Sequence, residues 1–190
     1  MDYRVLMENA LKGYPDRIKH TLGVRDRALE LGKIYDADLE VLEVASYLHD
    51  MTKYWKTEAH QKLINNPMIT DHFHEQLYHP ISAAIYAKSI GVTNPVTLEA
   101  IQYHMWGKIE MALETMILCV SDYCEKNRTF SDAKVVYQMA LIDRDKAYVH
   151  MLESTLKHLK EKQITPHQDQ IDTYHYYLKK ENKRINDIIK

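Results

Sequence analysis

The sequence predicts an all-α protein, and three observations support that prediction. Apolar residues recur at helical spacing over nearly the whole chain. The 190 residues include only five Gly and five Pro, which punctuate the periodic segments. We find no internal repeat and no convincing strand pattern. Because 45% of the residues are apolar and the composition shows no break, we expect residues 1–190 to form a single domain with a substantial core.

Capping and turn residues set the expected boundaries of the N-terminal helices. Gly13-Tyr14-Pro15 ends a first helix, and Asp16 can cap the second. The turn from Asp36 to Asp38 leads into a third helix, which is apolar on most of its circumference and ends at His49-Asp50. Asn65-Asn66-Pro67 ends a short fourth helix. The expected ranges are 2–11, about 16–35, the segment up to His49, and about 57–65, followed by a polar loop at 67–78.

The C-terminal half is expected to contain six further helices. Pro80 lies in the first turn of one that Gly91 ends, and Asn94-Pro95 opens the next. The most apolar segment follows, and then a helix capped by Ser131-Asp132. The last two helices are long, charged and amphipathic. The expected ranges are about 80–90, 95–105, 111–124, 131–142, 144–162 and 167–188, with the loops after residues 50, 66, 106 and 124 available to build a site.

Charge and cysteine spacing exclude several classes of partner. The formal net charge of −2 provides no basic field for duplex DNA or an anionic membrane. The first residues carry charges where a signal peptide is apolar, and no run approaches the roughly 18 apolar residues of a membrane span. Cys119 and Cys124 are spaced for neither a disulfide nor a Cys-x-x-Cys zinc site. We therefore expect a cytoplasmic protein that binds neither nucleic acid nor membrane.

Three polar residues occupy positions where burial of a polar group is costly. His20 shares a helix face with Val24 and Leu31, and His104 lies on the apolar side of its helix near the end. Asp122 lies in the most apolar segment, and because an unpaired buried carboxylate costs several kcal/mol, we expect it to have a cationic partner. Each has an ordinary alternative: a core His bonded to a carbonyl, or an Asp paired with Lys or Arg.

The dipeptide His49-Asp50 places an imidazole and a carboxylate where a buried helix ends. Adjacent helical residues point about 100° apart, so these two meet only if one swings across the helix end, as metal ligands often must. His79 precedes Pro80 at a helix start, where the dipole favours the neutral ring that binds metals. The alternatives are a surface His beside a capping Asp, and an N-cap role for His79.

The order His20, His49-Asp50, His79, His104, Asp122 resembles the HD superfamily of metal-dependent phosphohydrolases. Four segments are similar to the signatures of its YqeK-type bacterial branch, which is associated with symmetrical hydrolysis of diadenosine tetraphosphate. These segments are Arg17-Ile-Lys-His-Thr-Leu-Gly-Val24, Leu48-His-Asp-Met-Thr-Lys53, Ala100-Ile-Gln-Tyr-His104 with Gly107-Lys108, and Val120-Ser-Asp-Tyr-Cys-Glu-Lys-Asn-Arg128. The resemblance implies one HD domain with a metal-site core at about 17–130 and the helices at about 144–188 packed on it.

The resemblance also implies a two-metal centre. Its implied ligands are His20, His49, Asp50 and Asp122 for one ion, and His79 and His104 for the second, with Asp50 bridging. Four imidazoles and two carboxylates suit iron better than magnesium, with manganese or zinc as alternatives. We expect the ions to be divalent or trivalent. Such a pair lowers the pKa of a bridging water toward neutrality and supplies a hydroxide at pH 7.

Cationic and aromatic residues near the implied ligands are expected to hold the substrate. Lys53, Lys108 and Arg128 are candidates to offset phosphate charge, and Lys53 and Arg128 are the expected catalytic partners of Asp50. Each cation has the alternative role of a solvated surface charge. Tyr103 and Trp106 flank His104 and are placed to touch an adenine. Lys108 stands where the branch tends to have Arg, which replaces a bidentate phosphate contact with a point charge.

The reaction implied by the resemblance is attack on a β-phosphorus with ADP as the leaving group. The expected partners are therefore small nucleotides, diadenosine tetraphosphate and ADP. Two alternatives stay open: another nucleotide phosphohydrolase acting on a mononucleotide or a deoxynucleoside triphosphate, and a nucleotide-sensing module with a weak catalytic centre. We expect Tyr174, Tyr176 and Tyr177 to pack on the domain, or on a second subunit if the last two helices form a homodimer.

Overall fold

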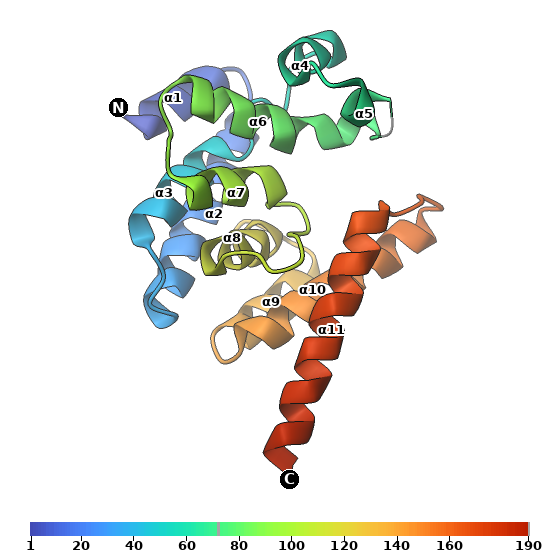
Figure 1. Cartoon of the computed structure of the whole chain (residues 1–190). Coiled ribbons are helices and arrows are strands. Elements are labelled where there is room, and N and C mark those ends of the chain that lie inside the picture. Colours follow the sequence, from blue (N-terminus) through green and yellow to red (C-terminus); the bar gives the residue numbers. More distant parts are fainter. Residues whose placement is uncertain (72, 190) are drawn as a thin grey trace.

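The computed structural model describes residues 1–71 and 73–189, and every regular element in this part of the chain is helical (Figure 1). This confirms the all-α prediction. The elements are α1 (Tyr3–Ala10), α2 (Pro15–Ile34), α3 (Leu39–Leu48), α4 (Thr57–Ile64), α5 (Pro67–Thr70), the 3-10 helix η1 (Glu75–Leu77), α6 (Tyr78–Ser89), α7 (Pro95–Tyr103), α8 (Leu113–Tyr123), α9 (Ser131–Ala140), α10 (Arg144–Glu161) and α11 (Gln168–Ile189).

Helix α8 joins two clusters of buried apolar side chains. One cluster gathers residues of α1, α2, α3, α6 and α7 and includes Leu118 of α8. The other gathers residues of α9, α10 and α11 with a few of α2 and α3, and includes Ile117 and Val120 of α8. Figure 1 shows α8 between α7 and α9, in agreement with these contacts. This apolar helix therefore lies between the two parts of the core, with residues on both of its faces buried.

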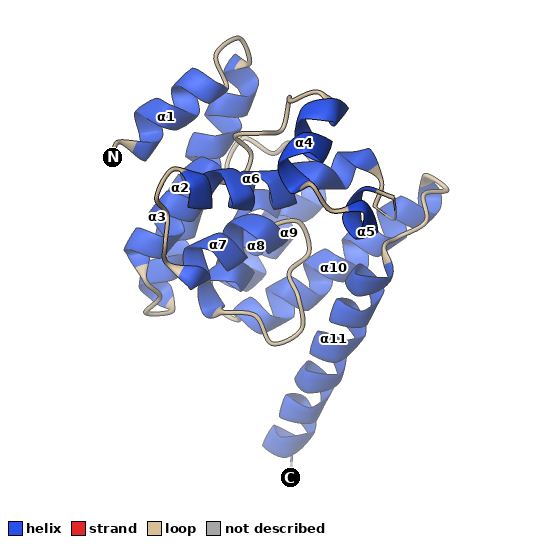
Figure 2. Cartoon of the chain, turned by 45° about the horizontal axis from the view of Figure 1, so that its top comes forward, coloured by secondary structure: helices blue, strands red, loops and turns tan. Residues whose placement is uncertain are grey.

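The C-terminal helices form a hairpin on one side of the fold. Helix α10 contacts α8 and α9, and α11 contacts α10. Tyr177 is buried, with its ring centroid 5.1 Å from that of Tyr148, and Tyr174 and Tyr176 pack on the same cluster. These tyrosines therefore pack on their own chain, the first of the two roles expected for them. The far end of α11 extends past the other helices to the C-terminus (Figure 2).

Several helix starts follow the sequence signals, and two differ. Asn94 caps α7, as predicted, and accepts hydrogen bonds from two backbone N–H groups. Asp16 is not a cap: because Pro15 is the first helical residue of α2, Tyr14 takes the N-cap position. Ser131-Asp132 does not cap α9 either. The Asp132 carboxylate accepts hydrogen bonds from Tyr123 and His150 instead, so tertiary contacts take the group that the local prediction assigned to a cap.

The polar segment at 67–78 contains regular structure, so the prediction of a plain loop was wrong. Asn66 caps the short helix α5, with Pro67 at its first position. The 3-10 helix η1 follows, capped by His74, and α6 already begins at Tyr78. Asn-Pro was interpreted as a stop signal for the preceding helix, but the same pair also starts a helix.

Two expectations from composition can be compared with the structure. In the described residues each helix is too short or too polar to cross a lipid bilayer. Cys119 and Cys124 are buried and form no disulfide in the described structure. Burial raises the pKa of both thiols, to about 12 for Cys124. Both thiols therefore stay protonated near neutral pH.

Candidate metal centre

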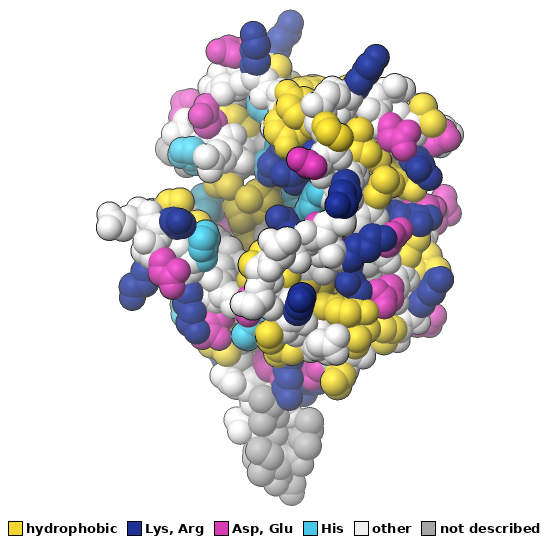
Figure 3. All heavy atoms as spheres, turned by 180° about the vertical axis from the view of Figure 1, so that it is seen from behind, with side chains coloured by type: hydrophobic (Ala, Val, Ile, Leu, Met, Phe, Trp, Pro, Cys, Tyr) yellow, Lys and Arg dark blue, Asp and Glu magenta, His cyan; other side chains and the backbone are white. Residues whose placement is uncertain are grey.

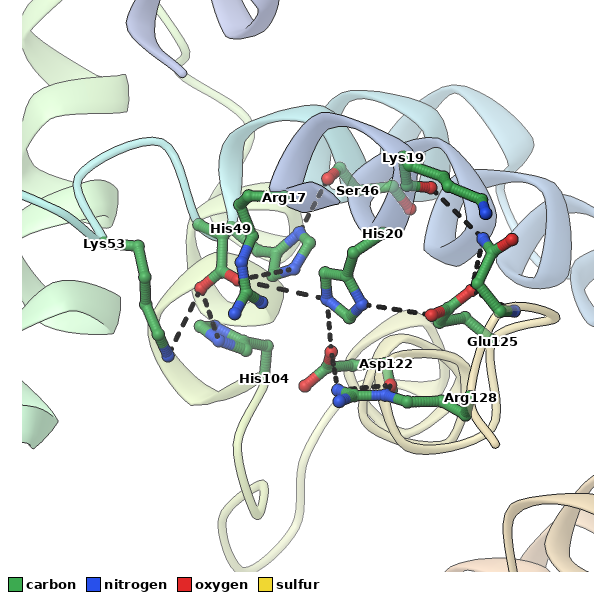
Figure 4. A network of polar contacts seen from close by, with 12 residues as sticks. Arg17, Lys19, His20, Ser46, His49, Lys53, His104, Asp122, Glu125 and Arg128 are labelled. Atoms are coloured by element: carbon green, nitrogen blue, oxygen red, sulfur yellow. Dashed lines mark hydrogen bonds and ion pairs between the residues drawn. The ribbon is translucent and has the colours of Figure 1, made fainter. Parts of the chain in front are cut away.

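Helix ends bring the predicted metal ligands together. His20 lies in α2, His79 in the first turn of α6 and Asp122 in the last turn of α8, while His49-Asp50 and His104 directly follow α3 and α7. Figure 4 shows His20, His49, His104 and Asp122 pointing toward a common region. We call the six residues the His/Asp cluster: His20, His49, Asp50, His79, His104 and Asp122.

Asp50 stands between two pairs of imidazoles. Its Oδ2 atom lies 3.9 Å from His20 Nε2 and 3.6 Å from His49 Nε2. Its Oδ1 atom lies 3.2 Å from His79 Nε2 and 3.7 Å from His104 Nε2. Each carboxylate oxygen therefore faces a different pair of ring nitrogens, as a carboxylate that bridges two ions requires.

The imidazole rings are held so that Nε2 faces Asp50. In His49, His79 and His104, Nδ1 lies 2.6, 3.0 and 2.8 Å from the backbone carbonyl oxygen three residues earlier, and a protonated Nδ1 donates to it. His20 Nδ1 lies 3.4 Å from Oε1 of the buried Glu125 instead. In His49, His79 and His104, a donating Nδ1 leaves the lone pair of Nε2 directed into the cluster.

Burial keeps His49, His79 and His104 neutral, and the neighbours of Asp50 keep it ionised. Desolvation lowers the pKa of His49, and it lowers the pKa of His79 and His104 to about 4. For Asp50, burial acts to raise the pKa, but the surrounding His49, His79 and Lys53 outweigh it and hold the pKa well below its usual range. Neutral imidazole and ionised carboxylate are the forms that bind metals. The sequence predicted a neutral His79 from the helix dipole, whereas burial is the largest cause.

Asp122 has the cationic partner that its apolar segment required. Its Oδ1 atom lies 3.4 Å from Arg128 Nη2, and 2.9 Å from His20 Nε2. Burial acts to raise the pKa of Asp122, but the interactions with His20 outweigh it and leave the pKa lowered. Asp122 therefore joins the cluster through His20.

The cluster fits the requirements of metal binding. His20, His49 and Asp50 form one group, and Asp50, His79 and His104 another, in which the candidate ligand atoms all lie within 4.8 Å of one another. The buried His49 Nε2 atom makes no hydrogen bond to any described residue. Buried polar atoms are nearly always satisfied, and a metal ion would satisfy this one. The donor set therefore fits divalent metal ions.

Two of the predicted cations lie at the cluster. Lys53 Nζ lies 2.9 Å from His79 Nε2 and 3.7 Å from Asp50 Oδ1. Arg128 contacts Asp122, as described above, and also donates to its backbone carbonyl at 3.2 Å. Both positive charges therefore lie beside the carboxylates that would hold the metal ions.

The other three predicted substrate contacts lie around a separate cavity. Tyr103, Trp106 and Lys108 line a cavity of about 340 Å³, which we call the Trp106 cavity. Lys108 Nζ lies 3.5 Å from Glu99 Oε2. Among the described residues, Met105 alone lines both this cavity and the larger cavity over Asp50 and Asp122. These three residues are near His104 in sequence but face another space, and their contact with an adenine stays a prediction.

Two site residues were not predicted. Arg17 Nη1 donates a hydrogen bond to Asp50 Oδ2 at 2.7 Å, and Glu125 accepts from His20. Both are three residues from a predicted ligand, Arg17 before His20 and Glu125 after Asp122. Residues three apart share a helix face, so this spacing was the signal that could have identified Arg17. Glu125 lies just beyond the end of α8, where the signal is weaker.

Comparisons with known proteins agree with this geometry. The HD domain family profile matches residues 17–127. The chain is 30% identical over 166 residues to proteins of Halalkalibacterium halodurans and Bacillus subtilis, each named bis(5'-nucleosyl)-tetraphosphatase, symmetrical. Each match covers 85% of this chain and 89% of the relative. A Staphylococcus aureus protein of the same name is 30% identical over 168 residues, covering 85% of this chain and 86% of the relative.

A solved structure gives the same result for the fold. It is a Clostridium acetobutylicum protein described as a predicted HD superfamily hydrolase involved in NAD metabolism. It superposes with a TM-score of 0.84 at 27% identity, over 94% of this chain and 96% of the other. The resemblance inferred from the order of His and Asp residues is thereby confirmed, and this chain belongs to the HD domain family.

Proposed function

We propose that this protein is a metal-dependent hydrolase that cleaves diadenosine tetraphosphate symmetrically into two ADP. The observation that carries the proposal is the position of Asp50, whose two carboxylate oxygens face two separate pairs of imidazoles. The curated relatives described above support the substrate, because their name specifies symmetrical cleavage of a bis(5'-nucleosyl) tetraphosphate.

Two metal ions are part of the proposal. One would be held by His20, His49, Asp50 and Asp122, and the other by His79, His104 and Asp50. Because imidazole nitrogens predominate, we expect iron, with manganese or zinc as alternatives. When bound, such ions lower the pKa of a water molecule and polarise a phosphate oxygen.

The protein's own cations would position the tetraphosphate. Arg17, Lys53 and Arg128 bring three positive charges to the two carboxylates of the cluster. The two guanidinium groups bind phosphate oxygens in pairs, and the Lys53 ammonium adds a third positive charge. Together they would offset the negative charge that develops on the phosphates during the reaction. Water adds to one of the two central phosphorus atoms, and the central P–O–P bond breaks. The leaving ADP takes the bond electrons, and the water's protons pass to solvent.

Product analysis tests this proposal. Protein purified without oxygen is analysed for metal content, given diadenosine tetraphosphate, and its products are separated by chromatography. We expect two ADP per substrate consumed. AMP with ATP would indicate asymmetrical cleavage, and turnover of mononucleotides alone would indicate a different phosphohydrolase. Binding of ADP without any metal-dependent turnover would favour a nucleotide-sensing module.

A further inference from the structure

Two cavities flank the His/Asp cluster. The larger, of about 720 Å³, extends from Asp50 and His104 to helix α10, and we call it the α10 cavity. The second, of about 400 Å³, lies over the start of α2 and the segment after α8, and we call it the α2 cavity. Both volumes lie within the range of small-molecule sites, roughly 300–1,000 Å³. Each cavity is therefore large enough for one nucleoside.

Three residues line both cavities: Arg17, Arg128 and Phe130. Arg17 reaches the cluster from α2 and Arg128 from the segment after α8 (Figure 4). Arg17 is bonded to Asp50 and Arg128 to Asp122, and their side chains keep 23% and 35% of their surface exposed. Two partly exposed guanidinium groups thus mark the line along which the cavities meet. A chain of phosphates is the ligand group that such a pair binds best.

The walls of the two cavities suit nucleosides rather than further phosphates. The α10 cavity combines the Tyr123 ring, 5.2 Å from that of Phe130, with the hydroxyl-bearing Ser154 and Thr155. The α2 cavity contains Tyr54, a residue that is 44% exposed and whose ring stacks on Tyr14 with 3.8 Å between ring centroids. Aromatic rings stack on bases, and hydroxyl groups bond to ribose.

We propose that the two cavities receive the two nucleoside halves of one dinucleoside tetraphosphate, which crosses the cluster between Arg17 and Arg128. This inference rests on the proposed function and extends it to the binding of the substrate. A tetraphosphate anchored at both ends places its central phosphates beside Asp50. The position of the cut therefore follows from the anchoring of two equal halves, and each product ADP leaves from its own cavity.

The Trp106 cavity is the rival location for the second nucleoside. It lacks Arg17, Arg128 and Asp50 among its lining residues, and Met105 stands between it and the α10 cavity. A phosphate chain from the cluster would have to pass this side chain. Figure 3 shows a hollow beside the α10–α11 turn whose floor is hydrophobic and whose rim includes Lys, Arg and His side chains.

The test fills each cavity separately in metal-loaded protein. Thr129→Trp fills the α2 cavity and Thr155→Trp the α10 cavity, while Thr93→Trp adds the same ring at an exposed site outside both. Titration calorimetry should give two ADP per chain for wild type and Thr93→Trp, and one for each cavity variant. The kcat/KM for diadenosine tetraphosphate should fall at least tenfold in both cavity variants. His158→Trp, at an exposed position of the α10 cavity, is used if Thr155→Trp does not fold.

The outcomes separate this inference from the proposed function. One ADP per wild-type chain overturns the two-cavity arrangement, and so does an unchanged kcat/KM in either cavity variant. Loss of one ADP in Trp106→Ala, with both cavity variants unaffected, would move the second nucleoside to the Trp106 cavity. If wild type produces no ADP from diadenosine tetraphosphate, the proposed function fails, while the ADP stoichiometry still decides whether two nucleotide cavities exist.

Discussion

Arg17 donates a hydrogen bond to Oδ2 of Asp50 at 2.7 Å, the oxygen that also faces His20 and His49. The guanidinium thus approaches the Asp50 carboxylate on the side of His20 and His49. Arg17 also lines both the α10 cavity and the α2 cavity, where its remaining N–H groups can meet a ligand. Burial acts to lower the pKa of Arg17, but Asp50 and its other neighbours outweigh this effect, so the side chain stays charged.

Replacement of Arg17 should reduce catalysis more than folding. Arg17→Ala removes a charged donor beside the site of phosphate attack, and we expect kcat for diadenosine tetraphosphate to fall by about 100-fold. Arg17→Lys should recover part of this loss, because it restores the charge without the paired donors. Lys33→Ala, an exposed change on the same helix, is the control. Equal kcat in wild type and Arg17→Ala would contradict a role in phosphate binding.

The metal-free protein should lose stability between pH 6.5 and pH 4. The pKa of His79 and of His104 is about 4 in the folded state, against an ordinary 6.5, so only the unfolded chain takes up these protons in that interval. As the pH decreases from 6.5 to 4, the free energy of unfolding should therefore decrease by up to roughly 3 kcal/mol for each imidazole. Below pH 4 these two groups should cause no further loss.

Urea denaturation at several pH values measures this effect. The variant His104→Gln should show a smaller decrease over the same interval, because one of the two groups is absent. A free energy of unfolding that is the same at pH 6.5 and pH 4.5 would show that these imidazoles are not buried in the neutral form.

Glu125 should orient His20 for metal binding. Glu125→Ala removes the acceptor of His20 Nδ1, and loss of such a partner typically weakens metal affinity by about 10- to 100-fold. Glu125→Gln keeps an acceptor oxygen and should recover most of the affinity. Competition with a chelator measures the metal affinity of the three proteins. Identical affinities would mean that His20 needs no partner to hold its orientation.

Gly23 should be irreplaceable although it lies inside a helix. A Cβ atom there would collide with the Glu125 carboxylate and the Asn127 amide, which pack against α2. Gly→Ala normally stabilises a helix interior by up to about 1 kcal/mol, whereas here overpacking should destabilise the protein by about 1–3 kcal/mol. Urea denaturation of Gly23→Ala gives the sign, and a stabilised variant would show that the Glu125 segment moves freely.

The helices, and the convergence of the His/Asp cluster, followed from the sequence because their signals are local. Asn94-Pro95 and Gly91 mark helix ends through backbone geometry alone, and Gly91 adopts a φ of 99°. His20 and Asp122 stood out because burial of a polar side chain needs a compensating partner. Asp16 was assigned wrongly because Pro15 already begins the helix, and Ser131-Asp132 because the helix begins at Ser131 and tertiary contacts take the Asp132 carboxylate.

Which cavity a side chain lines was harder to predict, because nearness in sequence does not fix the direction of a side chain. Trp106 is two residues from His104, but the chain leaves α7 there and Gly107 turns it with a φ of 76°, so the two side chains face different spaces. Lys53, three residues after Asp50, was predicted from that spacing, whereas Arg17 reaches the same carboxylate from α2, 33 residues earlier in the chain.

The claim that Asp50 stands between two metal ions is tested most directly by anomalous diffraction from crystals of protein loaded with iron without oxygen. We expect two peaks, one beside Oδ2 near His20 and His49, and one beside Oδ1 near His79 and His104. A single peak, or peaks that do not include Asp50 among their ligands, would contradict the account.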